Sequence, residues 1–239
     1  MSMAYELYYW SGIQGRGEFV RLALEDAGAD YRDMNREEGD SAAAKLMAQS
    51  GTPSFAPPFL KDGEIVVGQT AAILFYLGPR IGLAAKEERW RLWTHQIQLT
   101  IADLVVEAHD VHHPLGPGRY YEDQKDEAKL RAEEFRAQRM PKFLDWFETV
   151  LARNPAGPDH LVGAAVSYAD LSLFQAVEGL AYAFPQRMGV LLGNYPKVAA
   201  LHDAVAKRPR IASYLASDRR LKFSTDGIFR HYEELDARD

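Results

Sequence analysis

Side chains that could support chemistry lie close together near the N-terminus. Tyr8, Tyr9 and Ser11 place three hydroxyl groups around the end of an aromatic run. A hydroxyl group can donate a hydrogen bond to an anion such as a thiolate, and such a charge-assisted bond contributes about 1.5–3 kcal/mol. The chain contains no cysteine. Any thiol that takes part in the chemistry must therefore come from outside the protein.

Four histidines form a second group with a suggestive spacing: His95, His109, His112 and His113. His109 and His113 are four residues apart, which puts them on one face of a helix at a spacing that can bind zinc. However, no cysteine is available, and no glutamate follows as in the His-Glu-x-x-His motif. We therefore expect no metal. The plain alternative for these residues is a solvated helix end.

Composition narrows the class of protein. The 239 residues include 28 Lys and Arg against 34 Asp and Glu, which gives a formal net charge of -6. This acidic balance argues against nucleic-acid binding. The N-terminus lacks the pattern of a secretion signal, and no run approaches the ~18 apolar residues of a membrane span. We expect a soluble, cytoplasmic protein that binds neither nucleic acid nor a membrane.

The predicted secondary structure, which must position these residues, changes near residue 82 from mixed strands and helices to helices alone. Before this point, short β-like runs alternate with helical stretches in a βαβ order followed by ββα. The predicted strands and helices cover residues 5–10, 16–27, 31–35, 41–49, a hairpin at 59–67, and 69–77.

The second half of the sequence shows almost continuous helical periodicity. Long amphipathic helices are predicted over residues 86–113 and 122–152, the latter kinked at Pro141. Ser167 and Asp170 have the spacing of a capping box at the start of a further helix. Two or three shorter helices follow up to residue 216, and the tail from 222 to 239 is polar.

This order of elements, together with four short motifs, resembles the cytosolic glutathione transferase family over nearly the whole chain. The motifs are Tyr9-Trp10 followed by Gly15-Arg16, then Pro58-Phe59-Leu60-Lys61-Asp62-Gly63, Gly68-Gln69-Thr70-Ala71, and Ser167-Tyr168-Ala169-Asp170-Leu171. The resemblance implies an α/β thioredoxin-like N-terminal domain at residues 1–82. It also implies an all-α C-terminal domain at 86–239 and, usually, a homodimer.

The resemblance assigns catalysis to Tyr9. The tyrosine-type classes place such a tyrosine at the end of the first strand, before a Phe or Trp, and Tyr9-Trp10 fits that pattern. Tyr8 competes less well because alternate residues of a strand point to opposite faces. Ser11 also competes less well. Classes that use serine place it at the start of the first helix, where this chain has Gly17.

The resemblance also implies a set of glutathione-binding residues. Pro58 matches the cis-proline of the binding edge, but the residue before it is Pro57, which has no N–H to offer the cysteinyl part of glutathione. Ala56 replaces a residue that is often Gln or Asn. The other implied ligands of glutathione are Arg16, Lys45, Gln69, Thr70 and Asp103, the last of these across the dimer. His109 and His113 are placed beside the electrophile.

The predicted function is therefore a glutathione transferase. It takes glutathione as co-substrate, uses no metal, and lets the glutathione thiolate attack a small hydrophobic electrophile. Two alternatives stay open. One is a non-catalytic binding or structural protein, which Pro57 and Ala56 favour. The other is a glutathione-dependent isomerase or peroxidase.

Overall fold

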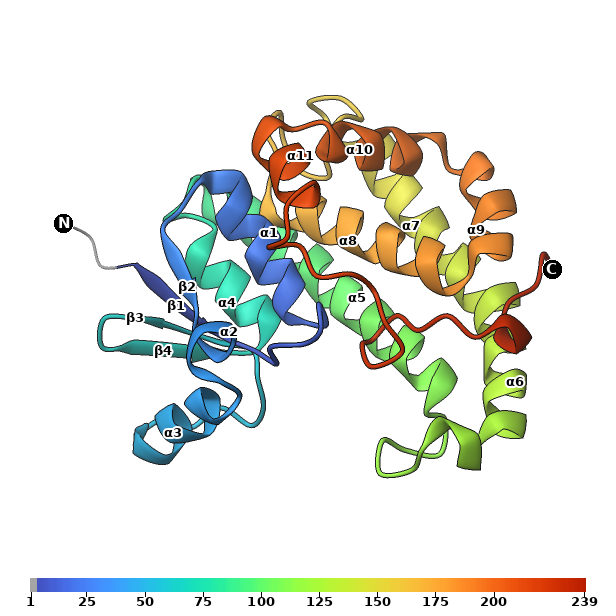
Figure 1. Cartoon of the computed structure of the whole chain (residues 1–239). Coiled ribbons are helices and arrows are strands. Elements are labelled where there is room, and N and C mark those ends of the chain that lie inside the picture. Colours follow the sequence, from blue (N-terminus) through green and yellow to red (C-terminus); the bar gives the residue numbers. More distant parts are fainter. Residues whose placement is uncertain (1–3) are drawn as a thin grey trace.

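Four short strands form a mixed sheet in the N-terminal part of the chain (Figure 1). The computed structural model describes residues 4–239. The strands lie in the order β2-β1-β3-β4, with β1 parallel to β2 and antiparallel to β3. Their bounds are β1 Tyr5–Tyr8, β2 Tyr31–Asp33, β3 Phe59–Asp62 and β4 Ile65–Gly68. The predicted βαβ-ββα order is thereby confirmed.

Helices cover both faces of this sheet, and the alternation along β1 decides which side chain faces which helix. Leu7 packs with Val20 and Leu24 of α1 (Gly17–Ala27) and with residues of α4 (Thr70–Leu77). Tyr8 points to the other face, where it stacks on Phe59 with ring centroids 5.1 Å apart. Residues of α2 (Met34–Glu38) and α3 (Ser41–Gln49) cover that face.

Two predicted strands are too long. The first ends at Tyr8 and not at residue 10, because the chain leaves the sheet there for the loop before α1. The second strand ends at Asp33 and not at residue 35, because Met34 already begins α2. The Asp33 carboxylate accepts a 2.7 Å hydrogen bond from Nε of the buried Arg21. We attribute the early end to this ion pair, which holds the strand end against α1 where the chain turns away.

The larger part of the molecule is a layer of helices. The long helix α5 (Glu88–His112) runs beside α8 (Tyr168–Ala183), which is buried along most of its length. The remaining helices surround these two (Figure 1). They are α6 (Lys125–Glu134), α7 (Met140–Arg153), α9 (Pro185–Leu191), α10 (Pro196–Ala206) and α11 (Pro209–Leu215). Four helices thus follow residue 167, where the sequence predicted a capped helix and two or three shorter ones.

The predicted helix over residues 122–152 is interrupted just before Pro141. A π-helical segment at Phe135–Arg139 separates α6 from α7. Proline has no N–H for the helical ladder, and its ring crowds the carbonyl four residues earlier. A π-bulge accommodates such a mismatch within one turn. The sequence placed the irregularity correctly but did not define its form.

The C-terminal tail, residues 222–239, returns across the end of α5 and reaches α9 (Figure 1). His112 Nε2 lies 2.8 Å from the carbonyl oxygen of Ile228. Asp236 accepts hydrogen bonds from the backbone N–H groups of Gln186 and Arg187 at the start of α9. Arg136 of the π-helical segment also donates to Asp239, so the tail is held against the helical layer at several places.

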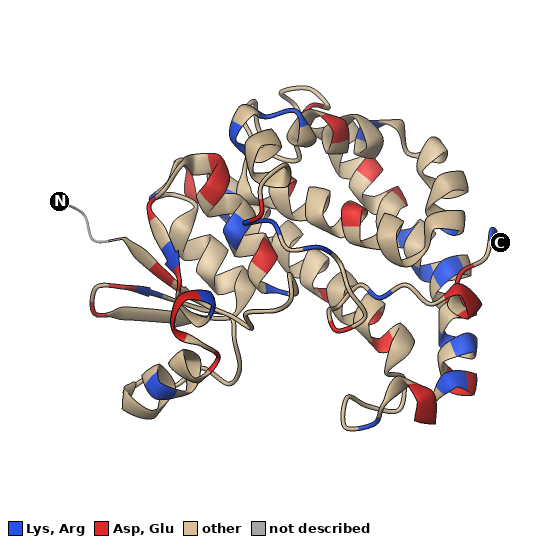
Figure 2. Ribbon diagram, viewed as in Figure 1, with Lys and Arg blue, Asp and Glu red and all other residues tan. Residues whose placement is uncertain are grey.

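Charged residues of both signs are interspersed over the helices and strands (Figure 2). Among the helices of residues 4–239, none combines the length and the apolar character needed to cross a membrane. The division into domains at 1–82 and 86–239 stays a prediction.

Candidate active site

Tyr9 follows β1 directly and is almost enclosed by the loop that leads into α1. Only 4% of its surface is exposed. Its phenol oxygen accepts a 2.9 Å hydrogen bond from the backbone N–H of Arg16. Glycines flank Arg16 on both sides. A Cβ atom at Gly17 would stand 2.6 Å from Cγ of Tyr9, and one at Gly15 would stand 2.1 Å from its phenol oxygen. The two glycines are needed for this close approach.

The hydrogen bonding at Tyr9 leaves its phenol as a donor. Burial raises the pKa of Tyr9, although the N–H of Arg16 opposes this shift. The hydroxyl is therefore protonated at neutral pH. Among residues 4–239 the Tyr9 oxygen accepts from the N–H of Arg16 and its O–H has no acceptor, so the O–H is available to an anion.

Arg16, Gln69 and Thr70 come together at the N-terminus of α4. The hydroxyl of Thr70 donates to the carbonyl oxygen of Arg16 across 3.2 Å, so the Arg16 peptide units connect Thr70 with Tyr9. Gln69 precedes the helix with φ of 67°, an unusual value for a residue other than glycine. The three residues line a cavity of about 380 Å³. The free N–H groups of the first helical turn favour a carboxylate at such a position.

The peptide bond between Pro57 and Pro58 is cis, as expected. Pro58 is buried directly before β3, and Pro57 is half-buried. The exposed residues Phe55 and Ala56 precede them.

Lys45 and Asp103 do not line the cavity formed by Arg16, Gln69 and Thr70. Lys45 is exposed on α3, and Asp103 is exposed on α5 without lining the cavity beside Thr70. The competing hydroxyl of Ser11 lies in the loop after Trp10, where the Ser11 N–H donates to Oδ1 of Asp40 across 2.9 Å. The first residue of α1 is Gly17, so no serine hydroxyl stands at that helix end.

His109 and His113 stack on one another at the end of α5, with ring centroids 5.2 Å apart. The ring of His112 packs edge-on against both. Burial lowers the pKa of all three, that of His112 to about 3. The guanidinium of Arg16 also lowers the pKa of His109, which ties this cluster electrostatically to the loop around Tyr9. We therefore expect neutral imidazoles at pH 7.

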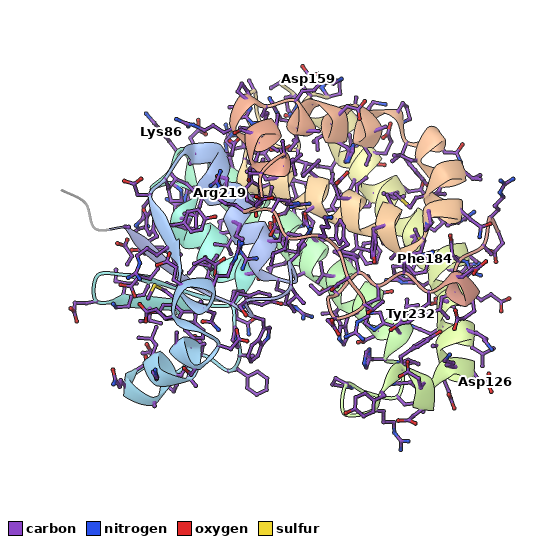
Figure 3. The ribbon with its side chains drawn as sticks, viewed as in Figure 1. Lys86, Asp126, Asp159, Phe184, Arg219 and Tyr232 are labelled. Atoms are coloured by element: carbon purple, nitrogen blue, oxygen red, sulfur yellow. The ribbon has the colours of Figure 1, made fainter. Side chains whose placement is uncertain are left out.

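Sequence reasoning missed the tail residues beside these histidines. Arg230 and Tyr232 line a cavity of about 690 Å³ together with His113 and the loop after α5. Tyr232, labelled in Figure 3 near the end of α5, stacks on Tyr121 with ring centroids 3.7 Å apart. No local signal could have revealed this contact, because it depends on the path of the tail. Among residues 4–239, no group of three or more His, Cys, Asp or Glu side chains could hold a metal ion.

The mixed four-stranded sheet, with a cis-proline beside its third strand, is joined to a large layer of helices. This is the arrangement that the resemblance to glutathione transferases implied. The family described as "Glutathione S-transferase, C-terminal domain" matches residues 109–218. Glutathione S-transferase P 1 of Xenopus laevis is 28% identical over 221 residues, which covers 91% of this chain and 94% of the relative. Glutathione S-transferase 2 of Onchocerca volvulus is 27% identical over 228 residues, covering 94% and 98%.

Solved structures agree with the fold. The pi-class glutathione S-transferase of Onchocerca volvulus superposes with a TM-score of 0.72 at 24% identity, covering 96% of this chain and 100% of that one. The glutathione S-transferase of Ascaris lumbricoides gives 0.67 at 25% identity, covering 92% and 99%. Residues 109–218 thus match the C-terminal domain of the glutathione S-transferases, and the whole chain is similar to these enzymes in sequence and in fold.

Proposed function

We propose that this protein transfers glutathione to small electrophiles. The observation that carries the proposal is the state of Tyr9: a buried, protonated phenol that accepts from the N–H of Arg16 and whose O–H is free to donate. A thiolate at that O–H attacks the electrophile. A carbon–sulfur bond forms, and a leaving group departs with the bonding electrons. The names of the relatives support this reaction.

Glutathione binds, on this proposal, with its glutamyl carboxylate at the start of α4. Arg16, Gln69 and Thr70 supply the cation and the polar groups there. Pro57 offers only its carbonyl oxygen to the cysteinyl part. We also propose Lys45 and, across the dimer, Asp103 as ligands of glutathione; neither lines the cavity beside Thr70 in a single chain. We place the electrophile beside His109 and His113.

A cytoplasmic, non-catalytic binding protein is the second candidate, because Pro57 removes one of the two backbone hydrogen bonds expected for glutathione. Calorimetric titration with glutathione in two buffers of different ionisation enthalpy separates the two candidates. A free thiol of pKa ~8.5 is about 3% ionised at pH 7. A site that lowers this pKa by ~2 units releases about 0.7 proton on binding.

Release of that size, with turnover of an aryl halide, is the result we expect. Binding of glutathione without proton release would instead support the non-catalytic binding protein. Absence of binding would mean that Pro57 and Ala56 have disabled the site.

We also propose that the protein is a homodimer that uses the exposed face of α5. Leu99 and Val106 are nearly half exposed there, at 47% and 46%, and line the cavity beside Thr70. Phe55, in the loop before the cis-proline, is 98% exposed. Leu99 and Val106 share one apolar surface on α5, which indicates a partner.

Replacing Leu99 with glutamate should therefore dissociate the protein into monomers at micromolar concentration, because the interface would then bury an unpaired charge. Sedimentation velocity measures the outcome. Leu130→Glu, at an exposed position of α6, is the matched control and should leave the dimer intact. If Leu99→Glu sediments like the unmodified protein, this face of α5 is not the interface.

A further inference from the structure

A second cavity, of about 350 Å³, lies away from the proposed glutathione site. Three tryptophans line it: Trp90 and Trp93 from α5 and Trp146 from α7. Trp93 and Trp146 meet edge to face, with ring centroids 6.2 Å apart. Its volume is in the range of small-molecule sites, which are mostly apolar with a few polar groups.

The loop that supplies another part of the lining, Pro155, Leu161 and Val162, is held in place by Asn154. Its side-chain amide nitrogen donates to the carbonyl oxygens of His160 and Gly163, each across 2.8 Å. Its side-chain oxygen accepts from the N–H groups of Ala156 and Gly163. Both N–H groups and both lone pairs of this amide therefore form hydrogen bonds within the loop between α7 and α8. Leu161 and Val162 of that loop face the cavity, which is therefore formed before any ligand arrives.

The charge that lines the cavity is positive. Among the described residues that line it, Arg153 is the one charged side chain, and none is acidic. Arg153 is exposed at the end of α7. A guanidinium pairs well with a planar anion such as a carboxylate or sulfonate. Indole rings favour offset or edge-on contact with another aromatic ring.

The cavity is separate from the proposed glutathione site and from the proposed dimer face. Trp93 and His109 are sixteen residues apart on one helix, which corresponds to about 24 Å. Trp93 and Ala102, which lines the cavity beside Thr70, point in directions about 180° apart around α5. In Figure 3, Asp159 marks the loop that walls the cavity, far from Tyr232 at the other end of α5.

We propose that this tryptophan cavity binds small aromatic anions, with the ring among Trp90, Trp93 and Trp146 and the anionic group on Arg153. This inference does not depend on the proposed transferase activity. A two-ring anion should bind with a dissociation constant on the order of 10–100 µM.

Equilibrium dialysis of 2-naphthalenesulfonate tests the proposal, with saturating S-hexylglutathione present to fill the thiol and electrophile sites. We expect one bound anion per chain. The neutral isostere 2-naphthalenesulfonamide should bind about fivefold more weakly, the size of effect that a partly exposed charge pair produces. In Arg153→Gln, the two compounds should bind equally.

A variant that fills the cavity provides the independent test. Thr149 is exposed on α7 and lines the opening, so Thr149→Trp should weaken binding roughly tenfold or more by occupying the space of the ring. Lys142→Trp adds the same bulk at an exposed position of α7 outside the cavity and should change nothing. The proposal is overturned if the sulfonate fails to bind beside S-hexylglutathione, if Thr149→Trp binds it normally, or if the sulfonamide binds as well as the sulfonate.

Discussion

Tyr9→Phe should lower turnover at pH 7 by about 10- to 150-fold, the worth of one charge-assisted hydrogen bond to a thiolate. The affinity for glutathione should change little, because the tripeptide is held at the start of α4 by other groups. The phenol of Tyr9 is protonated throughout the neutral range, since burial raises its pKa. Stopped-flow kinetics with an aryl halide measure the loss, and calorimetry measures the affinity.

The pH dependence of the variant gives a sharper result. In the unmodified protein, the thiolate is already formed near neutrality, so the rate should level off above about pH 7.5. In Tyr9→Phe, the rate should keep rising to about pH 9, as a thiol of ordinary pKa ~8.5 ionises. Tyr8→Phe is the control, because the Tyr8 hydroxyl lies on the other face of the sheet and bonds to Glu6. Equal turnover of Tyr9→Phe and the unmodified protein would remove Tyr9 from catalysis.

Asp170→Ala should cost about 3–5 kcal/mol of the free energy of unfolding. The Asp170 carboxylate is fully buried. It accepts three 2.7 Å hydrogen bonds, from the N–H of Leu161 and from the N–H and hydroxyl of Ser167. Its loss leaves buried donors without a partner, each at a cost of about 1–3 kcal/mol. Equilibrium urea unfolding measures the effect.

Two further variants keep this prediction testable if Asp170→Ala does not fold. Ser167→Ala removes the capping hydroxyl and should cost about 1 kcal/mol. Asp170→Asn retains the size of the side chain and should fall between the other two. The N–H of Tyr168 also bonds to the carbonyl of Leu83, so the start of α8 helps to join the helical layer to the segment after α4. If Asp170→Ala lost no more stability than Ser167→Ala, the carboxylate would be dispensable.

Features governed by neighbouring residues could be predicted from the sequence. The periodicity of two separated Tyr8 from Tyr9, and the predicted contrast is present: Tyr8 packs under α2 and α3, while Tyr9 meets the two glycines at the start of α1. The capping box at Ser167 and Asp170 is present. The predicted short helix over 41–49 coincides with α3. Each of these depends on side chains within one or two turns of chain.

The sequence could not supply distances between remote segments. Periodicity placed Trp90 and Trp93 on an apolar face of the long helix, but their cavity depends on Trp146 and on a loop that begins some sixty residues later. Lys45 and Asp103 were assigned by likeness, and neither lines the cavity beside Arg16 and Thr70 in the single chain. The contact of Tyr232 with Tyr121 follows only from the course of the tail.

The sequence by itself therefore determined the order of the elements, the two faces of β1 and the resemblance to glutathione transferases. Tertiary structure decided which side chains share a site. The reason is physical: hydrogen bonds and side-chain periodicity within a segment are local, whereas a cavity or an ion pair forms between segments whose relative positions depend on the packing of the whole core.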